Sequence, residues 1–168
     1  MTSGARGAAG SNDAGFSTPP GARFFEDYAT GSMHEFGSVR VELDEVMAFA
    51  RKFDPQPMHV DPEAAAVGPF RGIIASGWHT ASMMMRLFTD HYLSPVASIA
   101  SPGVDELRWT QPVRPGDTLR IRVRVLEARA SASKPDRGLV RSLIEVLNQR
   151  GDVVMSAKAM NLMLRRPA

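Results

Sequence analysis

The sequence predicts an α+β fold, in which an antiparallel sheet packs its apolar face against one long helix. At 168 residues, with 43% apolar and 23% charged side chains, the chain is long enough for one domain with a core but not for two. Its second half contains four segments rich in β-branched and aliphatic residues, joined by short turns, which is typical of consecutive antiparallel strands. The segment before them, residues 77–89, is an apolar helix that can cover such a sheet.

The first residues contribute little to a folded core. From Met1 to Pro20 the chain is mostly Gly, Ala, Ser, Thr and Pro, which is too poor in large apolar side chains to order itself. This stretch lacks the apolar region of a signal peptide. We therefore expect residues 1–22 to form a disordered N-terminal tail and residues 23–168 to form the single folded domain.

A strand and a helix are expected at the start of the domain. Residues 33–41 have a weak strand pattern, and residues 43–53 have apolar side chains at helical spacing. Pro55 ends this helix. Asp54 then lies just past the helix C-terminus, where the helix dipole disfavours a negative charge, so the pKa of its carboxyl group is expected to be raised.

The stretch from Asp54 to Asp61 reads Asp-Pro-Gln-Pro-Met-His-Val-Asp. Because proline excludes a helical conformation for the residue before it, we expect an extended, stiff loop. Residues 62–67 follow as a single helical turn, with Asp61 as its N-cap. After a loop at residues 68–72, the helix at 77–89 is expected to be buried, with its methionines filling the core.

Four strands are expected in the rest of the chain. Tight turns are predicted at Pro-Gly-Asp and Arg-Gly-Asp sequences, and a longer turn at Lys-Pro-Asp-Arg-Gly. The predicted strands cover residues 104–111, 118–129, 139–148 and 153–164.

Basic residues gather in the second half of the chain, although the formal net charge is only +2. Arg120, Arg122 and Arg124 alternate with aliphatic residues, which places them on one face of a strand. We interpret this face as the solvated side of an amphipathic strand. The sharper alternative is a docking surface for the phosphates of coenzyme A, because guanidinium groups bind phosphate well.

Several classes of protein are disfavoured. The chain has no cysteine, which excludes disulfides, thiolate metal sites and cysteine nucleophiles and fits a reducing cytoplasm. Its apolar runs are too short to span a bilayer. Its basic residues show neither aromatic interleaving nor a nucleic-acid-binding motif. We expect a cytoplasmic protein with no nucleic-acid or membrane partner.

Asp54 and His59 are the principal candidates for chemistry. They are a carboxylate and an imidazole five residues apart, separated by Pro55 and Pro57, so a stiff backbone can aim both groups at one water. That arrangement suits general acid–base catalysis. Taken singly, each residue also has a structural explanation, Asp54 as a turn residue and His59 as a loop histidine bonded to backbone groups.

The same residues carry a family resemblance. Asp54-x-Gln56-Pro57-x-His59-x-Asp61 resembles the signature Asp-x-Asn-Pro-x-His-x-Asp of the MaoC-like, R-specific enoyl-CoA hydratase family. Gly-Ile-Ile-Ala-Ser-Gly-Trp-His at 72–79 and Trp-Thr-Gln-Pro-Val-Arg-Pro-Gly-Asp at 109–117 resemble the family's sequences before and after its central helix. The similarity extends from about residue 24 to 165. Gln56 departs from the signature, since it is one methylene longer than the usual Asn.

The resemblance implies the hot-dog fold, an antiparallel sheet wrapped around a long central α-helix. It also implies reversible hydration of a trans-2-enoyl thioester to an (R)-3-hydroxyacyl thioester, with Asp54 and His59 sharing water activation and proton transfer. Gly77 would supply an oxyanion-hole N–H from a helix N-terminus. The remaining expected site residues are Gln56 and Ser76, for positioning water or substrate, and Trp78 and His79, for lining an acyl tunnel.

The resemblance implies an acyl-CoA or acyl-carrier thioester as substrate, no cofactor, and a homodimer. A metal site built from His59, Asp61 and His79 is not expected, because their spacing matches no ligand motif. Nor is a serine hydrolase expected from Ser76, His59 and Asp61, since no Gly-x-Ser-x-Gly sequence surrounds the serine.

Three other functions remain open at the level of sequence. A hot-dog thioesterase would place an acidic residue on or near the central helix, and residues 77–89 contain no Asp or Glu. A non-catalytic acyl-CoA-binding module would follow if Gln56 displaced the reactive water. The last alternative is a purely structural dimerisation domain.

Overall fold

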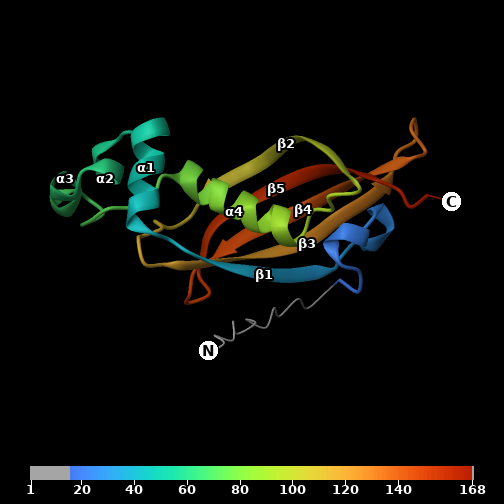
Figure 1. Cartoon of the computed structure of the whole chain (residues 1–168), viewed down its shortest axis with the longest axis horizontal. Helices are drawn as coiled ribbons and strands as arrows, with labels where there is room; N and C mark the ends of the chain where they lie inside the picture. Colours follow the sequence, from blue (N-terminus) through green and yellow to red (C-terminus); the bar gives the residue numbers. More distant parts are fainter. Residues whose placement is uncertain (1–15, 168) are drawn as a thin grey trace, which may run out of the picture.

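A five-stranded antiparallel sheet forms the main layer of the molecule, and one long helix crosses one of its faces (Figure 1). The computed structural model describes residues 16–167. The strand order is β1-β3-β4-β5-β2, so β1 and β2 are the two edges. All four pairings are antiparallel, as the sequence predicted. The strands are β1 Met33–Arg40, β2 Ser98–Trp109, β3 Thr118–Ala130, β4 Arg137–Leu147 and β5 Val153–Leu164.

The long helix, α4, runs from Gly77 to His91, two residues further than predicted. Its inner face packs on β1 and β3 and buries six side chains. The expectation of a buried helix holds for that face alone, because Trp78 and Met85 on the outer side are 59% and 46% exposed. The buried residues are His79, Thr80, Met83, Met84, Leu87 and Phe88.

In strand β3, buried and exposed side chains alternate between the two faces of the sheet. From Leu119 to Val125 its aliphatic side chains are buried, while the alternating arginines are partly or fully exposed. Arg122 lies 2.9 Å from Glu145 and Arg120 lies 3.4 Å from Glu35. The arginine face is therefore the outer face of the sheet, with two of its charges paired to neighbouring strands.

Three short helices cluster at the end of the sheet that holds the N-terminus of α4 (Figure 1). They are α1 Leu43–Phe53, α2 Pro57–Val60 and α3 Pro62–Val67. The prediction of an extended loop is wrong for α2, which forms a single helical turn. Pro57 begins that turn, where a missing N–H is tolerated, and Gln56 before it keeps the extended conformation that proline imposes, with ψ at 144°.

The segment before β1 contains the short 3₁₀ helices η1 (Pro20–Ala22) and η2 (Phe25–Asp27). Phe16 stacks on buried His34 with ring centroids 3.8 Å apart, and Thr18 bonds Asp27. The predicted disordered tail therefore ends earlier than residue 22, because its last residues carry an aromatic side chain that packs on the core. The part of that prediction covering residues 1–15 lies outside the described residues.

Strand β2 begins at Ser98, six residues before the predicted start. The earlier part contains Ser-Pro-Gly, which weakens a strand pattern, and its pairing with β5 is broken by three register shifts. The other four strands match their predicted spans to within two residues. Within residues 16–167, the structure has no helix long and apolar enough to cross a membrane.

Candidate active site

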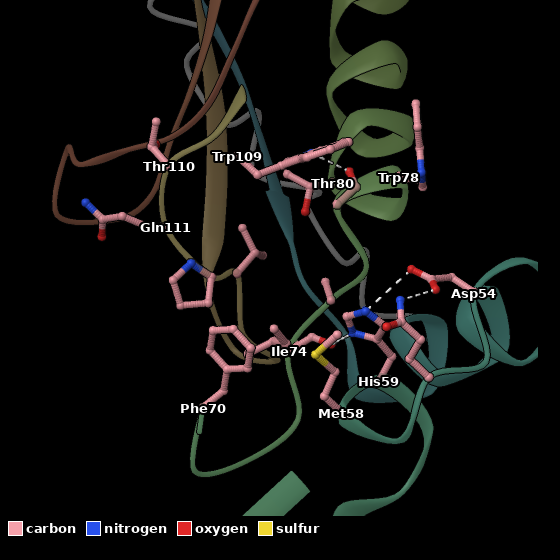
Figure 2. A pocket seen from close by; sticks show the side chains of 15 residues that line it. Asp54, Met58, His59, Phe70, Ile74, Trp78, Thr80, Trp109, Thr110 and Gln111 are labelled. Atoms are coloured by element: carbon pink, nitrogen blue, oxygen red, sulfur yellow. Dashed lines mark hydrogen bonds and ion pairs between the residues drawn. The ribbon is translucent and has the colours of Figure 1, made fainter. Parts of the chain in front are cut away.

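His59 is held in place by a backbone carbonyl. It lies in α2, is buried, and its Nδ1 is 2.8 Å from the carbonyl oxygen of Ile74. Because a carbonyl can only accept, Nδ1 carries the hydrogen. A neutral imidazole in this orientation presents the lone pair of Nε2, the nitrogen that lies 3.4 Å from Oδ2 of Asp54 (Figure 2).

Asp54 is the C-cap of α1, where its backbone N–H donates to the Ala50 carbonyl, and its carboxylate accepts two hydrogen bonds. Gln56 Nε2 donates to Oδ1 at 2.7 Å, and Ser76 Oγ donates to Oδ2 at 2.7 Å. These bonds, with the one from Gln56 the larger cause, lower the pKa of the Asp54 carboxyl group. The expectation of a raised pKa is therefore wrong, because direct donors to the carboxylate outweigh the opposing helix dipole.

The pair lies on the wall of a cavity of about 540 Å³ between the N-terminus of α4 and the segment that follows β2 (Figure 2). Such a volume is within the range of small-molecule sites. Apolar residues make up the larger part of the lining, and polar side chains make up the rest. The lining residues are Asp54, Gln56, Met58, His59, Phe70, Ile74, Ala75, Gly77, Trp78, Thr80, Trp109, Thr110, Gln111, Pro112 and Val113.

Gly77 is the first residue of α4 and lines the same cavity. Within residues 16–167 its N–H makes no hydrogen bond, as expected at a helix N-terminus. Trp109 Nε1 donates to the Gly77 carbonyl at 2.8 Å, and the indole packs so closely that an added Cβ on Gly77 would lie 2.5 Å from the ring. Glycine is therefore required here by the close approach of the indole.

The structure brings most of the other predicted site residues to this region. Gln56 and Trp78 line the cavity. Ser76 does not line it, but caps α4 and bonds Asp54. His79 is the exception, since it lies outside the cavity, buried and stacked on Phe49 with centroids 4.8 Å apart. The expectation that His79 lines a tunnel is corrected, because successive residues of a helix point in different directions and Trp78 takes the cavity side.

Sequence reasoning missed much of the apolar wall. Trp109 and Gln111 line the cavity and belong to a motif that carries the family resemblance, but the sequence alone does not identify them as site residues. Phe70 lies in the loop before Ile74, and Met58 directly precedes His59. A large aromatic side chain next to a recognised motif was the signal that could have identified Trp109.

A metal centre finds no support in the described part of the chain. Residues 16–167 contain no group of three His, Asp or Glu side chains placed to hold a metal ion. Asp61 is instead the N-cap of α3, accepting hydrogen bonds from the N–H groups of Glu63 at 3.0 Å and Ala64 at 3.1 Å. This is the capping role predicted for Asp61.

Comparison with known proteins decides the family. The model of the MaoC like domain matches residues 28–145, which is more than half of the chain. The protein is a member of the MaoC-like dehydratase domain family. The uncharacterized protein YdeM of Bacillus subtilis (strain 168) is 33% identical to this MaoC-like domain over 125 residues, covering 74% of this chain and 87% of YdeM.

Solved structures agree with this membership. The MaoC-like dehydratase from Rhodospirillum rubrum is 43% identical, with a TM-score of 0.81 over 88% of this chain and 100% of that one. The unliganded R-hydratase PhaJ1 from Pseudomonas aeruginosa is 26% identical, with a TM-score of 0.69 over 86% of each chain. A conserved hypothetical protein from Mycobacterium tuberculosis, 19% identical and described as a double hot-dog fold, superposes with a TM-score of 0.73 over 88% of this chain and 46% of that one. This MaoC-like domain has the hot-dog fold.

Proposed function

We propose that this MaoC-like domain is a hydro-lyase that reversibly adds water to a trans-2-enoyl thioester, giving an (R)-3-hydroxyacyl thioester. The observation that carries the proposal is the position of Asp54 and His59 on the wall of a largely apolar cavity, beside the N-terminus of α4. Similarity to the R-hydratase PhaJ1 and to a MaoC-like dehydratase supports the same reaction class.

The chain's own groups account for the proton transfers. In hydration, the water oxygen bonds to C3 of the substrate while one water proton passes to Nε2 of His59. The electrons of the C2–C3 double bond move to the thioester oxygen and form an enolate. The proton held on His59 then passes to C2 as the enolate collapses, and dehydration is the reverse sequence. The Asp54 carboxylate, 3.4 Å from Nε2, stabilises the imidazolium formed in between.

The Gly77 N–H is the proposed donor to the enolate oxygen. It lies at the positive end of the α4 dipole and lines the cavity. Because Gly77 has no side chain, a thioester carbonyl can approach the backbone closely. A donor of this kind contributes a few kcal/mol to transition-state stabilisation.

The thioesterase alternative is less well supported than the hydro-lyase, although helix α4 does contain one acidic residue. Helix α4 extends beyond the predicted end and includes Asp90. That carboxylate lies near the C-terminal end of α4, bonds Arg86 at 2.7 Å, and is not among the cavity-lining residues. It offers no acid or base to the site. The binding-module alternative predicts acyl-CoA binding without turnover.

We further propose that the substrate is presented as a coenzyme A or acyl-carrier thioester, that no cofactor takes part, and that the domain works as a homodimer. Support for the dimer comes from exposed apolar side chains on the outer side of α4 and on the edge strand β2. Both surfaces are of a kind that proteins usually cover. They include Trp78, Met85, Ile99 and Val104.

The proposed function is tested by hydration of crotonyl-CoA, followed by loss of the enoyl thioester absorbance. We expect wild-type activity, with kcat reduced about 10²- to 10⁴-fold in His59→Ala, which removes the acid–base group, and in Asp54→Asn, which removes the carboxylate that stabilises the imidazolium. Asp90→Asn is the matched control, since it removes a carboxylate outside the cavity, and it should retain wild-type activity.

Circular dichroism of all three variants establishes that their folding is intact. Wild-type inactivity across short, long and branched enoyl thioesters, together with tight acyl-CoA binding, would favour the binding module. Release of free thiol from saturated acyl-CoA would favour the thioesterase.

A further inference from the structure

The hydroxyl group of Ser76 connects the candidate catalytic pair to the N-terminus of α4. Ser76 is fully buried, its Oγ donates to Oδ2 of Asp54 at 2.7 Å, and the same Oγ accepts from the N–H of Trp78 at 3.3 Å. One oxygen therefore bonds the residue that ends α1 and the first turn of α4. Ser76 does not line the cavity, so its route to the chemistry is through Asp54.

Both carboxylate oxygens of Asp54 are occupied by donors. Ser76 bonds Oδ2, Gln56 bonds Oδ1, and Nε2 of His59 lies 3.4 Å from Oδ2. Protonation of the carboxyl group would weaken both hydrogen bonds, because it removes the negative charge of their acceptor. Hydrogen bonds to an ionised acceptor are about twice as strong as neutral ones, which favours the charged form of Asp54.

The other charged or titratable neighbours do not supply this effect. Arg51 and Lys52 lie in the last turn of α1 with exposed side chains, and the Lys52 ammonium lies over the Phe53 ring at 5.1 Å. His79, from α4, stacks on Phe49. The pKa of Asp54 is lowered first by the bonds from Gln56 and Ser76, and the charge of His59 is a smaller cause.

We propose that Ser76 is a positioning residue which, together with Gln56, holds Asp54 as a permanent carboxylate, so that His59 alone carries the proton between water and substrate. This inference rests on the proposed function. It gives Gln56 a defined part as well, since its side-chain amide donates to the Asp54 carboxylate. It also links Asp54 to Gly77, because Ser76 immediately precedes the oxyanion-hole residue.

The test compares wild type with Ser76→Ala and Ser76→Gly. Titration of the Asp54 carboxyl carbon by ¹³C NMR, without substrate, should give a higher pKa in both variants. In crotonyl-CoA hydration, kcat should fall about tenfold, as expected for loss of one hydrogen bond to a charged group. The acid limb of the pH profile should move to higher pH, and KM should change little.

Two variants separate this role from simple helix stability. Glycine is nearly as good an N-cap as serine, whereas alanine costs about 1 kcal/mol, so equal kinetic losses in the two Ser76 variants exclude capping as the cause. Ser82→Ala is the matched control, because it removes a hydroxyl that bonds the Trp78 carbonyl at 2.8 Å on the exposed side of α4. It should leave the Asp54 titration and the kinetics unchanged.

The outcomes distinguish this inference from the proposed function. An unchanged Asp54 pKa in both Ser76 variants overturns the role of Ser76, whatever their activity. A raised pKa with wild-type kinetics overturns it too, because Ser76 would then only shape the structure. An inactive wild type would contradict the proposed function. It would also contradict the catalytic part of the inference, even if the pKa of Asp54 rises in the Ser76 variants.

Discussion

Gly77 is confined on two sides, by the start of α4 and by the indole of Trp109. The indole N–H bonds the Gly77 carbonyl, and the ring lies where a Cβ would project. At the level of single residues, the same glycine thus positions an aromatic wall of the cavity and exposes a backbone donor to it. Any larger residue at this position would disturb both the aromatic wall and the backbone donor.

Gly77→Ala is expected to damage both roles. Its Cβ would lie 2.5 Å from the Trp109 ring, which forces the indole or the helix terminus to move. We expect kcat for crotonyl-CoA to fall at least about 100-fold, because this movement shifts the N–H away from the enolate oxygen, with an effect similar to loss of an oxyanion donor. Unfolding free energy should fall by about 1–3 kcal/mol, the usual cost of overpacking.

Gly103→Ala is the control for this substitution. An added Cβ there has no heavy atom within 4 Å, and both activity and thermal stability should stay close to wild type. Full activity in Gly77→Ala would contradict the expectation that the added Cβ displaces the indole or the helix terminus, because alanine keeps the backbone N–H.

At the scale of elements, the N-terminal segment seals one end of the core against β1 and α4. Phe16 stacks on His34 of β1 and meets Tyr92, the residue that ends α4, edge to face at 5.7 Å. Arg23 lies over the Phe16 ring at 3.6 Å and bonds the Tyr92 carbonyl at 2.9 Å. The titratable imidazole of His34 is therefore surrounded by aromatic side chains from the N-terminal segment, from β1 and from the end of α4.

The burial of His34 predicts a pH-dependent stability. Burial, and secondly the positive charge of Arg23, lower the pKa of His34 from 6.5 to about 4. The unfolded chain therefore binds a proton at a pH where the native imidazole stays neutral. The contribution of His34 to the free energy of unfolding is therefore fully present above pH 6.5. As the pH falls toward 4, this contribution decreases by on the order of 3 kcal/mol.

Urea unfolding at a series of pH values between 4 and 7.5 measures this loss. In His34→Phe, which keeps an aromatic ring against Phe16, the dependence on pH should be clearly flatter. The same slope in both proteins would show that other groups cause the acid sensitivity.

At the scale of the whole molecule, the single chain leaves two surfaces uncovered. Helix α4 covers one face of the sheet, but its own outer side exposes Trp78 and Met85. Strand β2 ends the sheet as an irregular edge, with Ile99 and Val104 exposed and a positive φ of 52° at Glu106. A second copy of the chain on these surfaces would bury apolar side chains beside the cavity, because Trp78 belongs to both.

Light scattering tests the dimer directly. We expect a mass of twice 18.3 kDa at working concentrations. Val104→Lys should shift the protein toward the monomer, since it places a charge on the edge strand, whereas Val67→Lys on α3, at a position 80% exposed, should not. A monomeric wild type would contradict the proposed assembly.

The sequence by itself determined most of the elements and their order along the chain. Alternation in β3 and helical spacing in α1 are local patterns, and each corresponds to the element found. The pairing of Asp54 with His59 was also predictable, because five residues of proline-containing chain limit how far apart the two can lie. The helical turn of α2 was missed, since the same prolines are compatible with a loop or with a helix start.

Only the tertiary structure decided the environment of the pair. Ser76 is 22 residues from Asp54 in sequence and Trp109 is 32 residues from Gly77, yet both bonds shape the site. The bond from Ser76, second to the bond from the nearby Gln56, is also one reason why the pKa of Asp54 is lowered where the helix dipole alone predicted a rise. The physical reason is that spacing along the chain restricts which neighbours in sequence can meet, whereas a pKa and a cavity wall depend on whatever donors and rings the fold brings within a few ångströms.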